Sequence, residues 1–148
     1  MKFAIITHVN HVKNEGNYFG YAPYIREMDI WLKNVDEVII VAPSSRAVIT
    51  PIDLAYKHHT IDFRKVPDFS FTSLKNNLIS VFKLPIIFWE IFGAMKKADH
   101  IHLRCPGNMG LIAGFVQIFF PNKIKTAKYA GNWDPKSKQP WTYRLQKY

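Results

Sequence analysis

A short segment in the C-terminal half of the chain combines residue types that suit an anionic ligand. Residues 104–108 read Arg-Cys-Pro-Gly-Asn and precede an apolar run over residues 109–120. The guanidinium group of Arg104 offers five N–H donors in a plane, a geometry that matches carboxylate and phosphate groups. The apolar run predicts a helix capped by Asn108, whose first N–H groups favour negative charge. We therefore predict an anion site at Arg104, Gly107 and Asn108, with a structural ion pair at Arg104 as the alternative.

A second candidate segment, residues 14–20, reads Asn-Glu-Gly-Asn-Tyr-Phe-Gly. Its glycines, Gly16 and Gly20, are four residues apart, and no Lys-Ser or Lys-Thr pair follows. The segment is therefore neither a dinucleotide fingerprint nor a P-loop. Gly16, Asn17 and Gly20 would let the backbone approach a bulky or phosphorylated group, although a plain turn explains the same residues.

A third candidate segment, Gly131-Asn132-Trp133-Asp134, is an unusual composition for a bare turn. Trp133 can stack on a sugar or a base, and Asn132 and Asp134 can hydrogen-bond to hydroxyl groups. The alternative is a tryptophan that covers the edge of a sheet.

Other kinds of chemistry lack the residues they need. The six histidines have no spacing that predicts a zinc site, and no Gly-x-Ser-x-Gly motif supports a Ser-His-Asp triad. We predict no metal and no cofactor, and we assign no catalytic residue. The lone Cys105 excludes a disulfide framework, and no N-terminal signal segment is visible, so we expect a reducing, cytoplasmic location.

Alternating apolar segments and amphipathic segments predict the elements that position these candidate sites. Apolar stretches at residues 2–9 and 38–41 do not alternate with polar residues, which is typical of strands buried on both faces. Further strands are expected at 58–66, 98–103 and 123–129. Helices are expected at 23–34, at 73–97 with a kink or a break at Pro85, at 108–120 and from 142 onward. Residues 10–20 are expected to be a loop, and residues 47–56 a loop or a short excursion.

This order predicts a single domain over residues 1–148. We expect an α/β doubly wound fold with a mainly parallel sheet and helices on both faces. In such a sheet, ligands bind outside the carboxyl ends of the strands, where all three candidate segments are expected to lie.

The apolar run over residues 78–95 is interrupted by Lys83, Pro85 and Glu90, which is unfavourable for a membrane span. We interpret it as a kinked, mostly buried helix, with an interfacial helix as the alternative.

The formal charge of +9 is concentrated at the C-terminal end, since residues 123–148 contain seven Lys and Arg and only one acid. A basic end favours a phosphorylated substrate, an anionic membrane surface or a nucleic acid as partner, and a solvated lysine face is the alternative. The basic residues form no known nucleic-acid-binding motif, so we predict no nucleic-acid partner.

Taken together, these features resemble the N-terminal domain of a GT-B glycosyltransferase of family 4 (group 1). The resemblance rests on a Gly-bearing first loop before an amphipathic helix (residues 16–32), on Ala-Asp-His-Ile-His-Leu-Arg at 98–104, on the apolar helix after Gly107 and on the strand ending at Gly131. Gly16 and Gly20 match the first-loop glycines of that family, and Gly131 matches the Gly of its His-Gly step. This chain has Ala130 where the family often has His.

The resemblance implies an acceptor-binding half of a two-domain Rossmann-like enzyme of polysaccharide biosynthesis. Such an enzyme moves a sugar from a nucleotide-sugar, its co-substrate, to a glycan, glycolipid or other small-molecule acceptor, and usually needs no metal. The nucleotide-sugar domain is absent from these 148 residues, so we expect a fragment that is inactive by itself and sits in the cytoplasm, in peripheral contact with the inner membrane face. The alternative is a stand-alone Rossmann-like module that binds a phosphorylated or sugar ligand without catalysis.

Overall fold

Apolar residues without alternation build the centre of the sheet. β1 (Lys2–Ile6) and β4 (Glu37–Ser45) are buried along most of their length, because helices cover both of their faces. β1 lies between β4 and β7 (His100–Cys105) and is parallel to both. β8 (Ile124–Tyr129) pairs in parallel with β7, and β6 (Ile61–Val66) pairs in parallel with β4.

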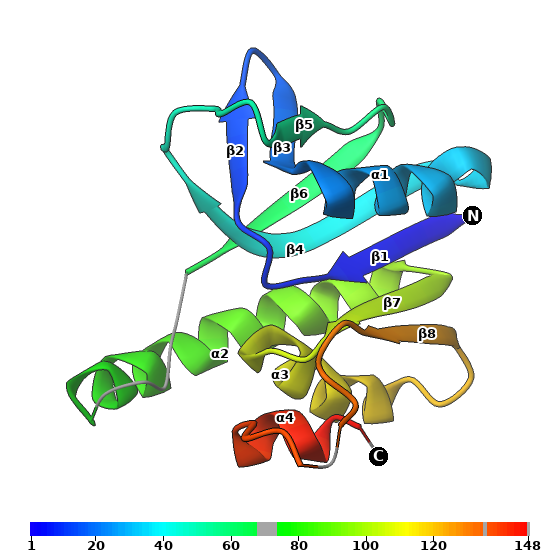
Figure 1. Cartoon of the computed structure of the whole chain (residues 1–148). Coiled ribbons are helices and arrows are strands. Elements are labelled where there is room, and N and C mark those ends of the chain that lie inside the picture. The colour runs from blue at the N-terminus through cyan, green and yellow to red at the C-terminus, as the bar shows by residue number, and fades with distance from the viewer. Residues whose placement is uncertain (68–73, 135, 148) are drawn as a thin grey trace.

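The computed structural model describes residues 1–67, 74–134 and 136–147, and of residues 74–81 it describes the backbone alone. Its eight strands form one sheet in the order β5-β3-β2-β4-β1-β7-β8, with β6 also on β4 (Figure 1). The predicted α/β class, with a mainly parallel sheet, is confirmed.

Helices cover the two faces of the sheet (Figure 1). One face carries α1 (Ala22–Trp31), which continues into a short 3-10 turn, η1 (Leu32–Asn34). The other face carries α2 (Leu74–Lys97) and α3 (Asn108–Val116), and α3 is followed by η2 (Gln117–Phe119). Two separate cores result. The core under α1 contains Phe3, Ile5, Tyr24, Ile25, Met28, Leu32, Val38 and Ile40. The core under α2 and α3 contains Ala4, Ile6, Ile39, Val41, Ile87, Ile91, Met95, Ile101, Met109 and Ala113.

The segment after β1 is a β-hairpin, so the prediction of a loop over residues 10–20 is wrong. β2 (His11–Asn14) and β3 (Asn17–Tyr21) are antiparallel, and β5 (Asp53–Ala55) adds a further antiparallel strand to β3. These strands are short and only two of their residues are buried, so they lack the apolar runs that indicate a buried strand.

α2 is one continuous helix through Pro85. The prediction that this segment is mostly buried is wrong for its described residues, because a full side of the helix faces solvent. Over the described part of the chain, no helix has both the length and the hydropathy needed to span a membrane.

The chain ends beside α3. After β8, residues 130–140 lead to the short helix α4 (Trp141–Leu145), where a helix was predicted from residue 142. Leu145 and Gln146 line a groove of about 350 Å³ together with Leu111 and Phe115 of α3, so the part of the C-terminal segment around residues 145–146 lies against α3.

Candidate functional site

The loops that follow β1, β7 and β8 meet at one end of the sheet. Because these three strands are neighbours and parallel, their carboxyl ends lie side by side. A Cβ atom added at Gly107 would lie 2.9 Å from Nδ1 of His8, and one added at Gly131 would lie 2.8 Å from Cγ of Pro106. The loop at residues 106–107 is therefore held between His8 on one side and Gly131 on the other.

The site residues predicted from the sequence do not include His8, because the spacing of the histidines was informative only for a metal site. The residue lies at the surface near the carboxyl end of β1, and its ring is partly covered by the backbone of Gly107. Partial burial, together with the positive charge of Arg104, lowers the pKa of His8 below 6.5. The ring is neutral at pH 7 and can accept a proton or a hydrogen bond from a hydroxyl group. Its position directly after the first buried strand is the signal that could have identified it.

A buried histidine holds the loop that contains His8. Nδ1 of His11 lies 2.8 Å from the carbonyl oxygen of Val9, and Nε2 lies 3.0 Å from the hydroxyl oxygen of Tyr56. These partners assign the ring proton to Nδ1, which donates to Val9, while Nε2 accepts from Tyr56. Burial lowers the pKa of His11 to about 4, so the ring is neutral and the loop is anchored at neutral pH.

Arg104 points to the α1 face of the sheet and forms an ion pair there. Its Nη1 donates to Oε2 of Glu27 at 2.7 Å, and its guanidinium group lies over the ring of Tyr24. Lys128, the partner of Arg104 in the β7–β8 register, lies 2.7 Å from the other oxygen of Glu27. The predicted anion-binding fork is thus occupied by a carboxylate of the chain itself, which agrees with the structural alternative.

The N-terminus of α3 is closed by α4. The N–H of Gly107 donates to Oε1 of Gln146 at 3.2 Å, and the side-chain amide of Gln146 donates to the carbonyl oxygen of Thr142. Asn108 is the first helical residue and Gly107 takes the cap position, without a side-chain cap. The prediction that Asn108 caps this helix is therefore wrong, since a residue 38 positions later supplies the acceptor.

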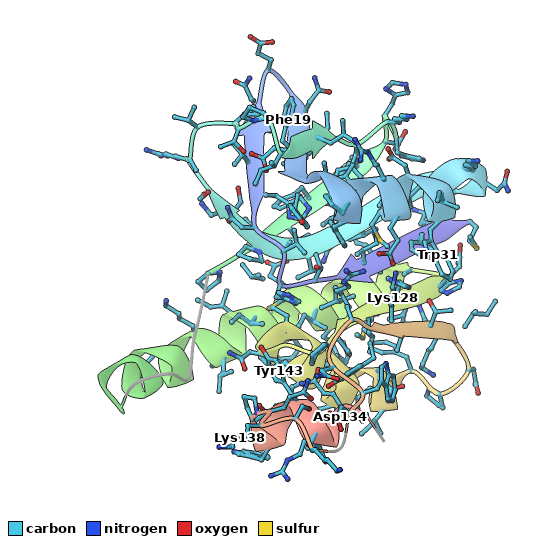
Figure 2. The ribbon with its side chains drawn as sticks, viewed as in Figure 1. Phe19, Trp31, Lys128, Asp134, Lys138 and Tyr143 are labelled. Atoms are coloured by element: carbon cyan, nitrogen blue, oxygen red, sulfur yellow. The ribbon has the colours of Figure 1, made fainter. Side chains whose placement is uncertain are left out.

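The hairpin glycines lie away from the other candidate residues. Gly16 and Glu15 have positive φ angles and form the tight turn at the tip of the hairpin, and Asn17 begins β3. A Cβ atom at Gly20 would approach the side chains of Ile25 and His11, so that glycine allows close packing over the buried imidazole. The hairpin and the loop at residues 131–134 lie at opposite ends of the molecule (Figures 1 and 2), so the structure does not bring Gly16 and Asn17 together with the other candidates.

The loop at residues 131–134 uses its polar side chains for local turns. Oδ1 of Asn132 accepts the N–H of Asp134, and Oδ1 of Asp134 accepts the N–H of Lys136, both at 2.9 Å. Trp133 contacts the ring of Tyr129 and keeps an exposed face. Of this segment, the exposed Trp133 ring remains available for stacking on a ligand.

A cavity of about 760 Å³ lies away from this site, at the amino end of β6. Its walls include Asp29, Lys33, Lys57 and His59. Oδ1 of Asp29 accepts the N–H of Lys57 at 3.1 Å. No local pattern in the sequence indicates this cavity, because its charged residues come from segments far apart along the chain. Among the described residues, no three His, Cys, Asp or Glu side chains are close enough to hold a metal ion.

In comparisons with known proteins, no family model, no curated protein and no solved structure matches this chain.

Proposed function

We propose that this chain is the acceptor-binding N-terminal half of a glycosyltransferase of the GT-B type. The observation that supports the proposal best is the contact between His8 and Gly107, which joins the carboxyl-end loops of β1 and β7 at the edge where α/β sheets bind ligands. A neutral imidazole at this place suits a neutral, hydroxyl-rich acceptor such as a glycan or the sugar of a glycolipid.

The exposed ring of Trp133 would add a stacking surface for a sugar near the same edge. The ion pair of Arg104 with Glu27 would fix the end of β7 under the acceptor and leave the phosphates of a nucleotide-sugar to a second domain. The full enzyme would act at the cytoplasmic face of a membrane and would use the nucleotide-sugar as co-substrate.

A binding experiment tests this proposal on the 148-residue chain itself. The labelled chain is applied to an array of oligosaccharides, and the strongest binder is then titrated into ¹⁵N-labelled protein and followed by NMR. We expect saturable shifts at His8 and Gly107, and no saturable shift with UDP-glucose or GDP-mannose alone. His8→Gln should weaken oligosaccharide binding about tenfold, equivalent to ~1.4 kcal/mol.

The matched control is His59→Gln, which changes an exposed histidine in the cavity at the amino end of β6. Its affinity should equal that of the unchanged chain. Absence of binding across the array would contradict the proposal, and so would shifts confined to the residues of that cavity. Tight binding of a nucleotide-sugar by the chain alone would favour a stand-alone binding module instead.

A further inference from the structure

The side of α2 that faces away from the sheet is apolar and exposed. Phe82 is 80% exposed, Ile86 56% and Trp89 65%, and Pro85 lies exposed between them. These residues recur at spacings of three and four, so they form one stripe along the helix. We call this stripe, Phe82, Pro85, Ile86 and Trp89, the outer face of α2.

The other sides of α2 have partners within the chain. Ile87, Ile91 and Met95 are fully buried in the core above the sheet. Glu90, the one acid between residues 82 and 97, lies 3.9 Å from Nη1 of Arg64 of β6. The charge of this acid is therefore balanced by a cation of the chain itself, and the four residues of the outer face carry no charge.

Aromatic rings extend the outer face onto η2. Trp89 contacts Phe92, and Phe92 contacts Phe119, with ring centroids 5.7 Å and 6.1 Å apart. Phe119 is 63% exposed. A row of exposed aromatic and aliphatic side chains of this size is larger than the single exposed apolar residues that are ordinary on soluble surfaces.

Positive charge continues the same stripe. Lys96 lies seven residues after Trp89, two helical turns further along the same face, and Lys97 follows it; both side chains are exposed. Tryptophan and phenylalanine beside lysine are the residue types that place a helix at the boundary between lipid headgroups and acyl chains.

We infer that the outer face of α2 docks this protein onto a membrane that contains anionic lipids. The helix lies in the plane of the membrane, with Phe82, Ile86 and Trp89 at the boundary between the headgroups and the acyl chains. Lys96 and Lys97 contact the lipid phosphates. A bilayer surface suits a stripe of exposed apolar side chains that ends in lysines, and the chain's net charge of +9 favours the anionic leaflet.

This location differs from the one that the charge distribution suggested. Of the lysines in β8 and just before it, Lys123 donates to three carbonyl oxygens at the end of α2, and Lys128 pairs with Glu27. Those cations serve the fold, whereas the outer face of α2 combines apolar insertion with exposed charge.

Vesicle binding tests the inference directly. The 148-residue chain is mixed with phosphatidylcholine vesicles with and without phosphatidylglycerol, and the bound fraction is measured by flotation. We expect binding to the anionic vesicles, weakened about tenfold by Trp89→Gln because a tryptophan leaves the lipid. Lys96→Gln combined with Lys97→Gln should weaken binding to the anionic vesicles roughly tenfold and leave the weak binding to neutral vesicles unchanged.

The matched control is Trp141→Gln, which removes a tryptophan of α4 that is 68% exposed. It should bind vesicles as the unchanged chain does. Circular dichroism of every variant confirms that the fold is retained. A chain that retains Trp89 as its single tryptophan should show a blue-shifted emission on vesicles, and one that retains Trp133 should not.

Three outcomes would overturn the inference. The first is that the chain binds neither kind of vesicle. The second is that Trp141→Gln loses vesicle binding and Trp89→Gln does not, which would assign docking to the basic C-terminal segment. The third is a dimer, seen by light scattering, that Trp89→Gln dissociates without changing vesicle binding, which would show that the outer face of α2 binds a second copy of the chain. Plain phospholipid vesicles carry no glycan acceptor, so these results are independent of the proposed acceptor site.

Discussion

Glu27 of α1 accepts a hydrogen bond from Nη1 of Arg104 of β7 at 2.7 Å, across 77 residues of sequence. Its second carboxylate oxygen lies 2.7 Å from Nζ of Lys128 on β8. One acid thus ties a helix to two neighbouring strands. The carboxylate also keeps two cations from lying side by side without a counter-charge at the carboxyl end of the sheet.

Glu27→Gln should lower the free energy of unfolding by about 1–3 kcal/mol at pH 7, because it leaves Arg104 and Lys128 without a charged acceptor. Burial opposes the charge of Glu27, but Lys128 and Arg104 outweigh burial and hold the pKa of Glu27 below 4.5. The stabilisation is therefore fully present above pH 4.5 and is lost as the pH falls through the lowered pKa. Urea unfolding at several pH values measures this difference.

The control for Glu27 is Glu37→Gln, which breaks the more exposed pair between Lys2 and Glu37. We expect a clearly smaller loss there, because solvent screens an exposed ion pair. Equal losses of stability in the two variants, or a Glu27→Gln effect that persists at pH 2, would contradict a stabilising role for the charge of Glu27.

Gly107→Ala should displace the His8 ring, because the new Cβ atom would lie 2.9 Å from Nδ1 and 3.2 Å from Cγ of that ring. We expect a loss of stability of about 1–3 kcal/mol from this overpacking. Partial burial and the charge of Arg104 lower the pKa of His8, so a ring pushed outward should show a pKa closer to 6.5. NMR titration of the His8 ring protons measures this change.

Gly114→Ala is the matched control for Gly107, since a Cβ atom at that position of α3 meets nothing within 4 Å. It should stabilise the helix by about 0.5–1 kcal/mol. A His8 pKa that is the same in both alanine variants would contradict the contact described above.

His102→Phe should make the protein less sensitive to acid. Burial lowers the pKa of His102 to about 4, and Nε2 of this ring has no hydrogen-bond partner among the described residues. Because the folded-state pKa lies below the unfolded value of 6.5, stability is fully present above pH 6.5 and falls as the pH drops toward 4. Between pH 7 and pH 5, protonation of this group in the unfolded state lowers the free energy of unfolding by about 2 kcal/mol. His102→Phe should not show this loss.

Phenylalanine suits position 102 because the ring there already packs beside Phe3 and Trp31. The substitution removes the hydrogen bond between Nδ1 of His102 and the hydroxyl group of Thr126, 2.8 Å long. That hydroxyl group keeps Nε2 of His100 as a partner at 3.0 Å. His59→Phe, at an exposed site, should leave the pH dependence unchanged. If the free energy of unfolding falls with pH equally in the unchanged chain and in His102→Phe, His102 is not the cause of the acid sensitivity.

Lys123→Met should destabilise the protein by about 1–2 kcal/mol, because it removes the cation at the C-terminus of α2. Nζ of Lys123 donates to the carbonyl oxygens of Met95, Lys96 and Ala98 at 2.6–2.8 Å. Lys125→Met removes one longer contact, to the carbonyl oxygen of Pro121, and should change stability by less than about 0.5 kcal/mol. Chemical denaturation of the two variants side by side compares them, and equal losses would show that Lys123 has no special capping role.

The central architecture could be predicted because it depends on local patterns. Continuous apolar runs at β1 and β4 indicate strands covered on both faces, and Pro23 with the spacing of Tyr24, Ile25 and Met28 indicates an amphipathic helix. Trp31, placed on the same face by its spacing, is partly exposed, because the helix ends there and turns into η1.

The candidate site could be predicted in part. The parallel order of the strands brings Gly107 and Gly131 to one edge, beside Pro106. The hairpin glycines were expected at the same edge, but the β2–β3 ribbon carries Gly16 and Asn17 away from it. A ligand role for any of these residues stays a prediction.

The sequence by itself determined which segments become buried strands and helices, because burial on both faces demands unbroken apolar runs and burial on one face demands helical spacing. Only the tertiary structure decided the partners of the polar groups. Glu27 meets Arg104, Gln146 caps α3, and His8 lies against Gly107, in each case between residues far apart along the chain. Such contacts depend on strand order and helix placement, which no local spacing of residues encodes.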